Sequence, residues 1–233
     1  MVCKTPLAGQ SKTRLSPPLT AEQCAGLSAC FIRDVAATIG SLGSGVTGYA
    51  VYTPAGSEPA LRELLPHDFR LLLQGGGDLG GRLIKATDDL LAQGHVGSVL
   101  VNSDGPTLPG SILRAAVDAV RRDAIRHGDN VVLSPALDGG YTLIGLSTPH
   151  PEIFTGIPWS TADTYKMTLQ RAAESALAVT NVPPWYDIDD LASLRVLQAE
   201  LDGSPPACAT AETIGGGAPA TRRFLAALAR TTP

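Results

Sequence analysis

The hydrophobic positions of this chain form two kinds of run, one with helical spacing and one that is continuously apolar. After the capping-box pattern Thr20-Ala21-Glu22-Gln23, apolar residues recur every three or four positions, which predicts a helix from Thr20 to Ser41. Similar spacing predicts helices over Glu58–Leu65, Asp78–Gln93, Ser111–Arg126, Thr161–Leu177, Leu191–Leu201 and Ala220–Ala229. Short β-type runs predict strands at Val46–Thr53, Phe69–Leu73, Val96–Val101, Asn130–Leu133 and Tyr141–Leu146, after a very short first strand.

Apolar strands that alternate with amphipathic helices are typical of a parallel sheet covered on both faces. We therefore expect an α/β protein with an open, mainly parallel sheet and helices on both faces. Residues 1–202 are expected to form one domain, and residues 203–233, which are rich in Gly and Pro at first, a C-terminal appendage packed on it. Ligands of such sheets bind beyond the carboxyl ends of the strands, so the chemistry should lie there.

Composition narrows the classes of function. The 233 residues are 44% hydrophobic and carry a formal charge of -4, which supplies one large core and argues against generic binding to nucleic acid or anionic lipid. The sequence contains no apolar run of membrane-spanning length and no apolar signal region near Met1, so we expect a cytoplasmic protein. The four scattered cysteines are expected to be reduced and mostly buried. Oligomeric state cannot be read from these features.

A basic, glycine-containing segment follows the first strand. Lys4, Gly9, Lys12 and Arg14 lie within eleven residues, and backbone N–H groups and fixed positive charges of this kind can bind a diphosphate or triphosphate. The segment lacks the Gly-Lys-Ser/Thr ending of a Walker loop. The spacing of these residues is also consistent with a solvated basic loop that binds no phosphate.

Acidic residues mark the ends of two other strands. Asp104 follows the apolar strand ending at Val101, where a carboxylate can bind Mg²⁺ or Mn²⁺, although a lone Asp at a strand end is more often a turn or helix-cap residue. Asp138 stands in Asp138-Gly139-Gly140 between two predicted strands. The three residues suit a hairpin turn, and they would also let an acceptor approach the backbone while Asp138 orients a hydroxyl.

Alternate carboxylates occur near the end of the main domain. Asp187 and Asp189 point to one side if this segment is extended, and a cation between them would relieve their repulsion. We therefore predict that Asp189 is a metal ligand. The alternative is that Asp189 or Asp190 caps the helix beginning at Leu191.

Two weaker motifs lie between these segments. The glycine-rich turn with Gln74, Asp78 and Gly80 could present amide and backbone groups to a base, or it could only begin a helix. Trp159 could form a stacking wall, while Ser160 or Thr161 caps the following helix.

Taken in order, these motifs resemble a bacterial family of glycosyltransferase-like, nucleotide-diphosphosugar transferases, some of which lie in arsenosugar or radical-SAM gene neighbourhoods. More remotely the chain is similar to 2-phospholactate guanylyltransferase and molybdenum-cofactor guanylyltransferase. The similarity covers about Lys4 to Leu194. It rests on Lys-x-Pro-x-x-Gly-x-x-Lys-Thr-Arg-Leu, Gln-x-x-Gly-Asp-Leu-Gly-x-Arg, Ser-Asp-x-Pro, Pro-Ala-x-Asp-Gly-Gly-Tyr, Pro-Trp-Ser-Thr and Asp-x-Asp-x-x-Leu.

The resemblance implies a GT-A variant of the Rossmann-like fold with a nucleotide bound over the strand ends and a divalent metal, Mg²⁺ or Mn²⁺. It implies donor binding by Lys4, Gly9, Lys12, Arg14, Gln74, Asp78 and Gly80, with Lys12 and Arg14 also catalytic. It implies metal binding by Asp104 and Asp189, a catalytic Asp138, and an acceptor site at Gly139, Gly140, Trp159 and Ser160.

Two features depart from the family pattern. Only Met1-Val2-Cys3 precede Lys4, so either the protein begins upstream or its first strand is unusually short. The Asp104 motif has Asn102 where the family pattern would place a second acid, so the metal must draw another carboxylate from elsewhere, and Asp189 is the candidate.

The leading hypothesis is a metal-dependent transferase that moves a sugar from a nucleotide diphosphosugar to a small acceptor. The alternative is a nucleotidylyltransferase that transfers guanylyl or cytidylyl from a nucleoside triphosphate and releases pyrophosphate, because the cationic loop has more charge than a diphosphate requires. A third possibility is an inactive nucleotide-binding regulator. In each case the partner is a small-molecule nucleotide, with no nucleic acid and no membrane span.

Overall fold

The computed structural model describes residues 1–126 and 128–231, and residues 232 and 233 of the predicted appendage lie outside this range. The strands are β1 (Val2–Lys4), β2 (Tyr49–Thr53), β3 (Arg70–Leu73), β4 (Ser98–Val101), β5 (Asn130–Pro135), β6 (Tyr141–Leu146) and β7 (Ala178–Asn181). The α-helices are α1 (Ala21–Gly40), α2 (Glu58–Arg62), α3 (Leu79–Ala92), α4 (Gly110–Ile125), α5 (Thr164–Glu174), α6 (Leu191–Leu201) and α7 (Pro219–Thr231). None of these helices is long and apolar enough to cross a membrane.

The strands form two hydrogen-bonded groups that meet at the first strand. β1, β2 and β3 are parallel in the order β1-β2-β3, and the others follow the order β4-β6-β5-β7, in which only β6 runs antiparallel to its neighbours. A parallel bridge between Val2 and Asn102 joins β1 to the end of β4. The carboxyl end of β4 therefore lies beside the start of the three-residue β1, which runs parallel to it.

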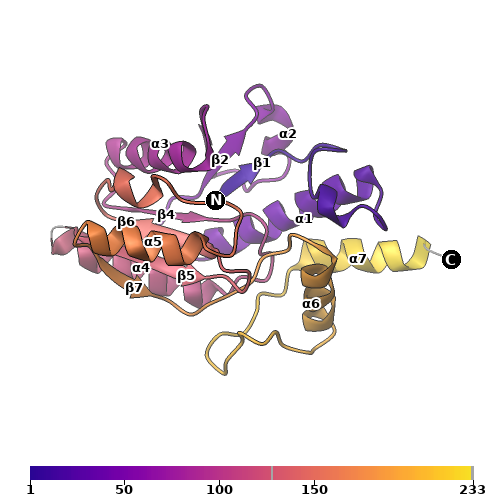
Figure 1. Cartoon of the computed structure of the whole chain (residues 1–233). Coiled ribbons are helices and arrows are strands. Elements are labelled where there is room, and N and C mark those ends of the chain that lie inside the picture. The colour runs from indigo at the N-terminus through magenta and orange to yellow at the C-terminus, as the bar shows by residue number, and fades with distance from the viewer. Residues whose placement is uncertain (127, 232–233) are drawn as a thin grey trace.

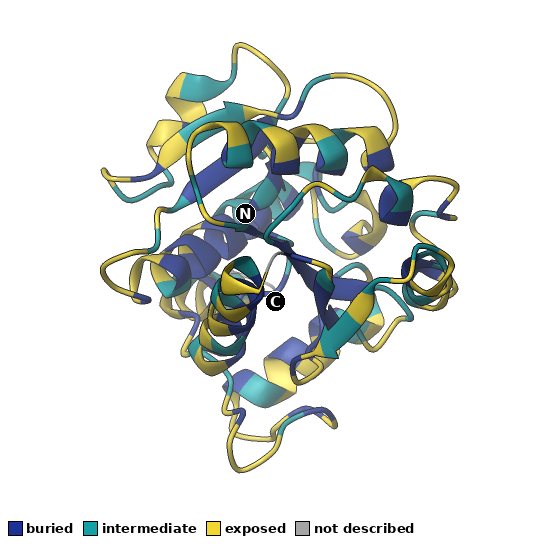
Figure 2. Cartoon of the chain, turned by 90° about the vertical axis from the view of Figure 1, so that its left-hand side faces the viewer, coloured by how far each residue is buried: buried dark blue, intermediate teal, exposed yellow. Residues whose placement is uncertain are grey.

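Helices cover both faces of the sheet, as Figure 1 shows. One buried cluster joins α1 and α4 to the strands, and the other joins α3 and α5 to the opposite face. Figure 2 shows buried residues on the strands and on the inward sides of the helices, with exposed residues outside. This architecture confirms the predicted α/β class with a mainly parallel sheet and helices on both faces.

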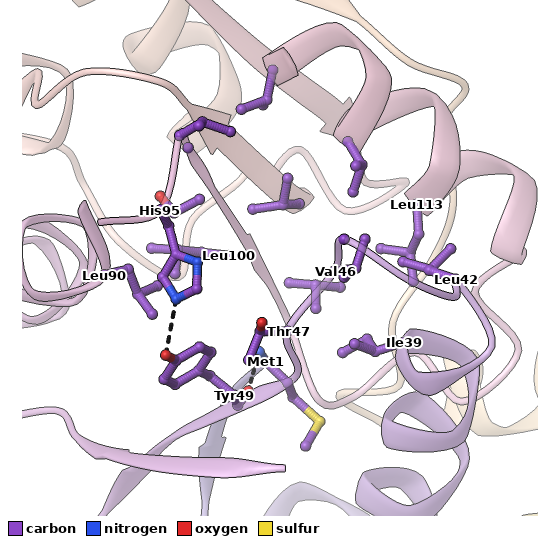
Figure 3. Close-up of a pocket in the computed structure, with 18 of the residues that line it drawn as sticks. Met1, Ile39, Leu42, Val46, Thr47, Tyr49, Leu90, His95, Leu100 and Leu113 are labelled. Atoms are coloured by element: carbon purple, nitrogen blue, oxygen red, sulfur yellow. Dashed lines mark hydrogen bonds between the residues drawn. The ribbon is translucent and has the colours of Figure 1, made fainter. Parts of the chain in front are cut away.

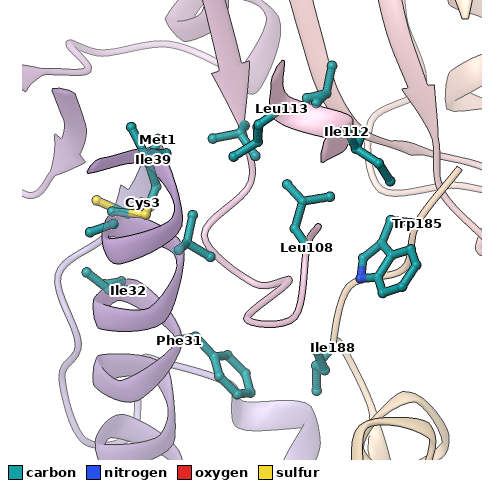
Figure 4. Packing of buried hydrophobic residues seen from close by; sticks show 14 of the residues in the cluster. Met1, Cys3, Phe31, Ile32, Ile39, Leu108, Ile112, Leu113, Trp185 and Ile188 are labelled. Atoms are coloured by element: carbon teal, nitrogen blue, oxygen red, sulfur yellow. The ribbon is translucent and has the colours of Figure 1, made fainter. Parts of the chain in front are cut away.

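The core extends beneath the loops at the carboxyl end of the sheet. Trp185 and Ile188 are fully buried and belong to the same cluster as Phe31 and Ile112. Figure 4 shows Trp185 and Ile188 packed on the side of this cluster away from α1. The indole N–H of Trp185 also donates to the hydroxyl of Thr107, at 3.3 Å. The segment that carries Asp187 is thus anchored on both sides by buried apolar residues.

Most predicted elements are present, with shifted ends. The α1 capping box is formed by Thr20 and Gln23, and β6 and α6 have the predicted bounds. The predicted strands at Val46 and Val96 begin later, at Tyr49 and Ser98, and the helix predicted from Thr161 begins at Thr164. Strand β7 was not predicted. The turn at Asp138-Gly139-Gly140 joins antiparallel β5 and β6, which confirms the hairpin interpretation.

The C-terminal segment packs along α1, as the neighbouring ribbons of α1 and α7 in Figure 1 show. The carboxylate of Asp34, only 3% exposed, accepts hydrogen bonds from the backbone N–H groups of Ala220 at 2.9 Å and Thr221 at 2.8 Å. These bonds satisfy two of the otherwise unpaired donors at the start of α7. The division of the chain at Asp202 stays a prediction.

Candidate functional site

A buried lysine joins two acidic segments at the carboxyl end of the sheet. The Lys12 ammonium lies 2.8 Å from Asp104 Oδ2 and 3.1 Å from Asp189 Oδ1, and it donates to the carbonyl oxygen of Ile188 at 2.5 Å. Burial by itself lowers the pKa of this ammonium, but the two carboxylates outweigh burial and raise the pKa above its ordinary value. Lys12 is therefore a fixed positive charge.

The backbone of Lys12 is also unusual. Its φ of +49° and ψ of +39° lie in the left-handed region, which a residue with a side chain seldom adopts. Lys12 precedes the short 3-10 helix Thr13–Leu15, and Leu15 is completely buried. The buried ion pairs and this apolar anchor together hold the strained residue, as is common where a side chain must be placed accurately.

Three carboxylates gather beside this lysine. Asp138, Asp187 and Asp189 each offer an oxygen, and these oxygens lie within 4.8 Å of one another. Burial, reinforced by the neighbouring carboxylates and by Asp138 above all, raises the pKa of Asp187 to about 7. Hard oxygen donors at such spacing, whose mutual repulsion a cation would relieve, fit Mg²⁺ or Mn²⁺.

The sequence-based metal pair, Asp104 and Asp189, is arranged differently from this cluster. The Lys12 ammonium lies between Asp104 and Asp189, so it already supplies the positive charge that the two carboxylates share. Asp187 joins the cluster instead, although it was not among the predicted ligands. The signal was present in the Asp-x-Asp spacing, because alternate residues of an extended segment point to one side. The role of Asp104 and Asp189 as a metal pair stays a prediction.

A pocket of about 140 Å³ opens beside the cluster. Its lining includes Asp138, Asp187 and Asp189 together with Asn102, whose amide donates to Asp187 Oδ2 at 3.4 Å. The remaining lining is mostly apolar. It consists of Val2, Leu79, Leu83, Leu100, Ile144, Tyr141, Trp159 and Gly140, with the polar residues Ser160, Thr161 and Thr164.

The predicted acceptor residues lie around this pocket. Gly139 has a φ of +93°, and a Cβ there would come within 2.2 Å of the Ala162 carbonyl oxygen, so only glycine fits. The carbonyl oxygen of Gly139 accepts a hydrogen bond from the N–H of Tyr165 at 2.9 Å, and Gly140 N–H donates to Asp138 Oδ1 at 2.9 Å. The turn that carries Asp138 is thereby fixed to the start of α5. Ser160 has a φ of +62° beside Trp159.

The three residues predicted to lie near the base have internal contacts. The Gln74 amide is buried and donates to the carbonyl oxygens of Cys3 at 3.0 Å and Val51 at 2.9 Å, which ties the strands together. Asp78 accepts from Gly81 N–H at 2.9 Å and caps α3. Gly80 packs against Trp159. These contacts give each of the three residues a structural role. The participation of Gln74, Asp78 and Gly80 in donor binding stays a prediction.

The other loop residues predicted to hold phosphate lie at the surface. Lys4, Gly9 and Arg14 are exposed, and Lys4 Nζ donates to the carbonyl oxygen of Gln10 at 3.3 Å. Gly9 has a φ of +73° and open space around its Cα, so its turn requires glycine while its backbone is accessible. Lys4 and Arg14 are thus the cations of this loop that face solvent.

A second cavity, also about 140 Å³, lies at the opposite ends of the strands, between α1, α3 and α4. Figure 3 shows apolar side chains such as Ile39, Leu42 and Leu113 around it. The Tyr49 hydroxyl contacts His95 Nε2 at 2.9 Å, and the N-terminal ammonium of Met1 donates to the carbonyl oxygen of Tyr49 at 2.8 Å. Among its described lining residues there is no carboxylate. The chemistry expected at the strand ends therefore belongs to the first pocket.

Comparison with known proteins gives two matches. A sequence profile for "Uncharacterized protein conserved in bacteria (DUF2064)" matches residues 43–161, just over half of the chain. Among solved structures, the chain is similar to a crystal structure from Desulfovibrio desulfuricans G20 that is provisionally named a nucleotide-diphospho-sugar transferase. The TM-score is 0.77 and the identity 28%, over 98% of this chain and 95% of that chain. No curated protein matches the sequence significantly.

Proposed function

This chain belongs to the bacterial family DUF2064, and from that premise we propose that it transfers a sugar from a nucleotide diphosphosugar to a small acceptor with the help of Mg²⁺ or Mn²⁺. The observation that carries the proposal is the convergence of Asp138, Asp187 and Asp189 beside a pocket at the carboxyl end of the sheet. Ligands of open α/β sheets bind at this end. The similarity to a structure named as such a transferase, over nearly the whole chain, supports the same reaction class.

In this proposal Asp187 and Asp189 hold the cation. A divalent cation at this position supplies positive charge against the diphosphate that leaves the sugar. Lys12 keeps Asp189 in place, because its ammonium binds both Asp189 and the neighbouring carbonyl oxygen of Ile188. Asp104 balances the second side of that ammonium at 2.8 Å. Lys12 and Asp104 therefore act as positioning residues.

Asp138 is assigned to the acceptor. It is the exposed member of the cluster, and one of its oxygens accepts the N–H of Gly140 at 2.9 Å, which fixes the carboxylate. Its position on the pocket lining suits a group that orients an acceptor hydroxyl and accepts its proton as the new bond to the sugar forms. Lys4 and Arg14, the exposed cations of the first loop, are assigned to the diphosphate.

The alternative is nucleotidylyl transfer, which the remote similarity to the guanylyltransferases would favour. Its main support from the sequence was the excess charge of Lys4, Lys12 and Arg14. Lys12 is committed to two carboxylates, which leaves two exposed cations, and that number suits a diphosphate. The burial of Lys12 thus supports sugar transfer over the alternative.

The product identifies the reaction. Purified protein is incubated with Mg²⁺ or Mn²⁺ and a panel of nucleotide sugars or nucleoside triphosphates, and the released nucleotide and pyrophosphate are measured. Release of a nucleoside diphosphate from a nucleotide sugar supports the proposal, whereas pyrophosphate release from a triphosphate establishes the alternative. Binding without turnover of any donor would favour the inactive regulator. Asp187→Asn should lower the rate at least about 100-fold, and Asp163→Asn, an exposed residue outside the cluster, should not change it.

A further inference from the structure

The lining of the pocket beside the carboxylates has two chemically distinct parts, an apolar half made of hydrophobic side chains and a charged half made of carboxylates. Its apolar half comes from side chains on different elements: Val2 of β1, Leu79 and Leu83 of α3, Leu100 of β4 and Ile144 of β6. Trp159 also lines the pocket. Leu83 and Leu100 are almost completely buried, so this half reaches into the core and is not a surface depression. An occupant would place an apolar group there with a favourable transfer free energy.

The charged half of the pocket has one sign. The lining includes the carboxylates of Asp138, Asp187 and Asp189, and among the described lining residues there is no lysine, arginine or histidine. The ammonium of Lys12 is not part of this lining, and it is already bound to the carboxylates of Asp104 and Asp189. Even with one divalent cation, three carboxylates leave a net negative charge on this side. An anionic occupant would therefore meet repulsion in a partly desolvated site.

The wall of the pocket is held in place before any ligand binds. The Trp159 ring meets the Tyr141 ring edge to face, with centroids 6.4 Å apart and planes at 80°. A Cβ at Gly80 would approach Trp159 Nε1 to 3.0 Å and the Phe154 carbonyl oxygen to 2.6 Å. Gly80 thus lets α3 pack closely against the indole, and the shape of the apolar half depends on this contact.

Building on the proposed function, we propose that the acceptor is an alcohol without a negative charge, whose apolar body is about the size of one six-membered ring. The size follows from the cavity volume of about 140 Å³, since an apolar cavity of roughly 150 Å³ holds benzene. The body occupies the apolar half, and the hydroxyl faces Asp138. In the transfer, the acceptor oxygen bonds to the sugar carbon, the bond from that carbon to the diphosphate breaks, and the hydroxyl proton passes to Asp138. The nucleoside diphosphate leaves with the electron pair of the broken bond.

Two probes that share a ring and a hydroxyl test the charge requirement. Benzyl alcohol and 4-(hydroxymethyl)benzoate are titrated into the full-length protein with Mg²⁺, and binding is followed by tryptophan fluorescence, with Trp159→Phe identifying the signal from the pocket. Benzyl alcohol is expected to bind at least about tenfold more tightly, because like charge disfavours the carboxylate probe. Equal or tighter binding of the carboxylate probe would overturn the proposal.

A charge introduced at the pocket wall provides a second, matched test. Leu79 is 37% exposed at the start of α3 and lines the pocket, whereas Leu73 is 40% exposed at the end of β3 and does not. Leu79→Lys should narrow or reverse the preference for benzyl alcohol, and Leu73→Lys should leave it unchanged. If both variants behave alike, the pocket does not select the acceptor.

Failure of this inference can be separated from failure of the proposed function. Slow hydrolysis of the nucleotide sugar without acceptor reports the sugar-transfer chemistry, while probe binding reports the pocket and needs no turnover. Hydrolysis together with a preference for the carboxylate probe overturns only the acceptor class. Displacement of the nucleotide sugar by benzyl alcohol would assign the pocket to the donor's sugar and overturn the inference as well.

Discussion

Lys12 is the residue on which the most contacts of the site converge. Its side chain is only 8% exposed, while Asp104 and Asp189 are 33% and 48% exposed. Lys12→Met should therefore leave two partly solvated carboxylates without a counter-charge and cost about 1–3 kcal/mol, less than a fully buried pair would. Chemical denaturation measures this change.

A surface ion pair provides the control for Lys12. Lys85 pairs with Asp89 one helical turn away, and both side chains are substantially exposed. Lys85→Met should change the free energy of unfolding by less than about 0.5 kcal/mol, because such pairs contribute little in solvent. Similar losses for the two variants would show that Lys12 is not a structural centre of the site.

Asp187 should make the metal-free protein sensitive to pH. Its folded pKa is raised to about 7 from an ordinary value of 3.8, so the folded state favours the protonated carboxyl. The resulting stabilisation is fully present below about pH 4 and is lost as the pH rises through 7. Asp187→Asn should remove this dependence of stability on pH. In EDTA at pH 8 the variant should therefore melt several degrees above the wild type, and at pH 5 this difference in melting temperature should be smaller. An equal difference at pH 5 and pH 8 would contradict the assignment.

Local signals explain how far the elements could be predicted. A capping box and regular apolar spacing identify α1, and the cap at Asp190 identifies the start of α6, because these features act within one turn. Strand β7 escaped prediction because Ala178–Asn181 has no buried residue and depends on its pairing with β5. Likewise, the spacing of Asp187 and Asp189 could be read along the chain, but the approach of Asp138 and Lys12 depends on tertiary structure.

The packing of α7 on α1 can be tested at two glycines of the same helix. A Cβ at Gly26 would come within 2.7 Å of the Phe224 ring, whereas a Cβ at Gly40 would meet nothing within 4 Å. Gly26→Ala should displace Phe224, lower the free energy of unfolding by about 1–3 kcal/mol and speed hydrogen exchange in α7. Gly40→Ala should be neutral or slightly stabilising. Unchanged exchange in α7 of the Gly26 variant would contradict the packing described for Phe224.

At the scale of the whole molecule, the site connects the two strand groups. Lys12 follows β1, Asp104 follows β4, and Asp138 lies between β5 and β6, while the isolated bridge of Val2 and Asn102 links the two groups directly. A cation at the carboxylate cluster should therefore stabilise the complete fold. At 100 times its Kd, Mn²⁺ should add about 2.7 kcal/mol, or roughly 5–10 °C in a protein of this size.

That shift should appear as one cooperative transition, because the ligands belong to loops that are anchored in a common core through Trp185 and Ile188. Differential scanning calorimetry with and without Mn²⁺ measures it. Asp189→Asn should abolish most of the shift, since it removes a ligand oxygen from the cluster, whereas Asp163→Asn should retain it. An equal shift in both variants would mean that Mn²⁺ binds elsewhere. A shift confined to one of two transitions would mean that the strand groups unfold separately and that the site does not couple them.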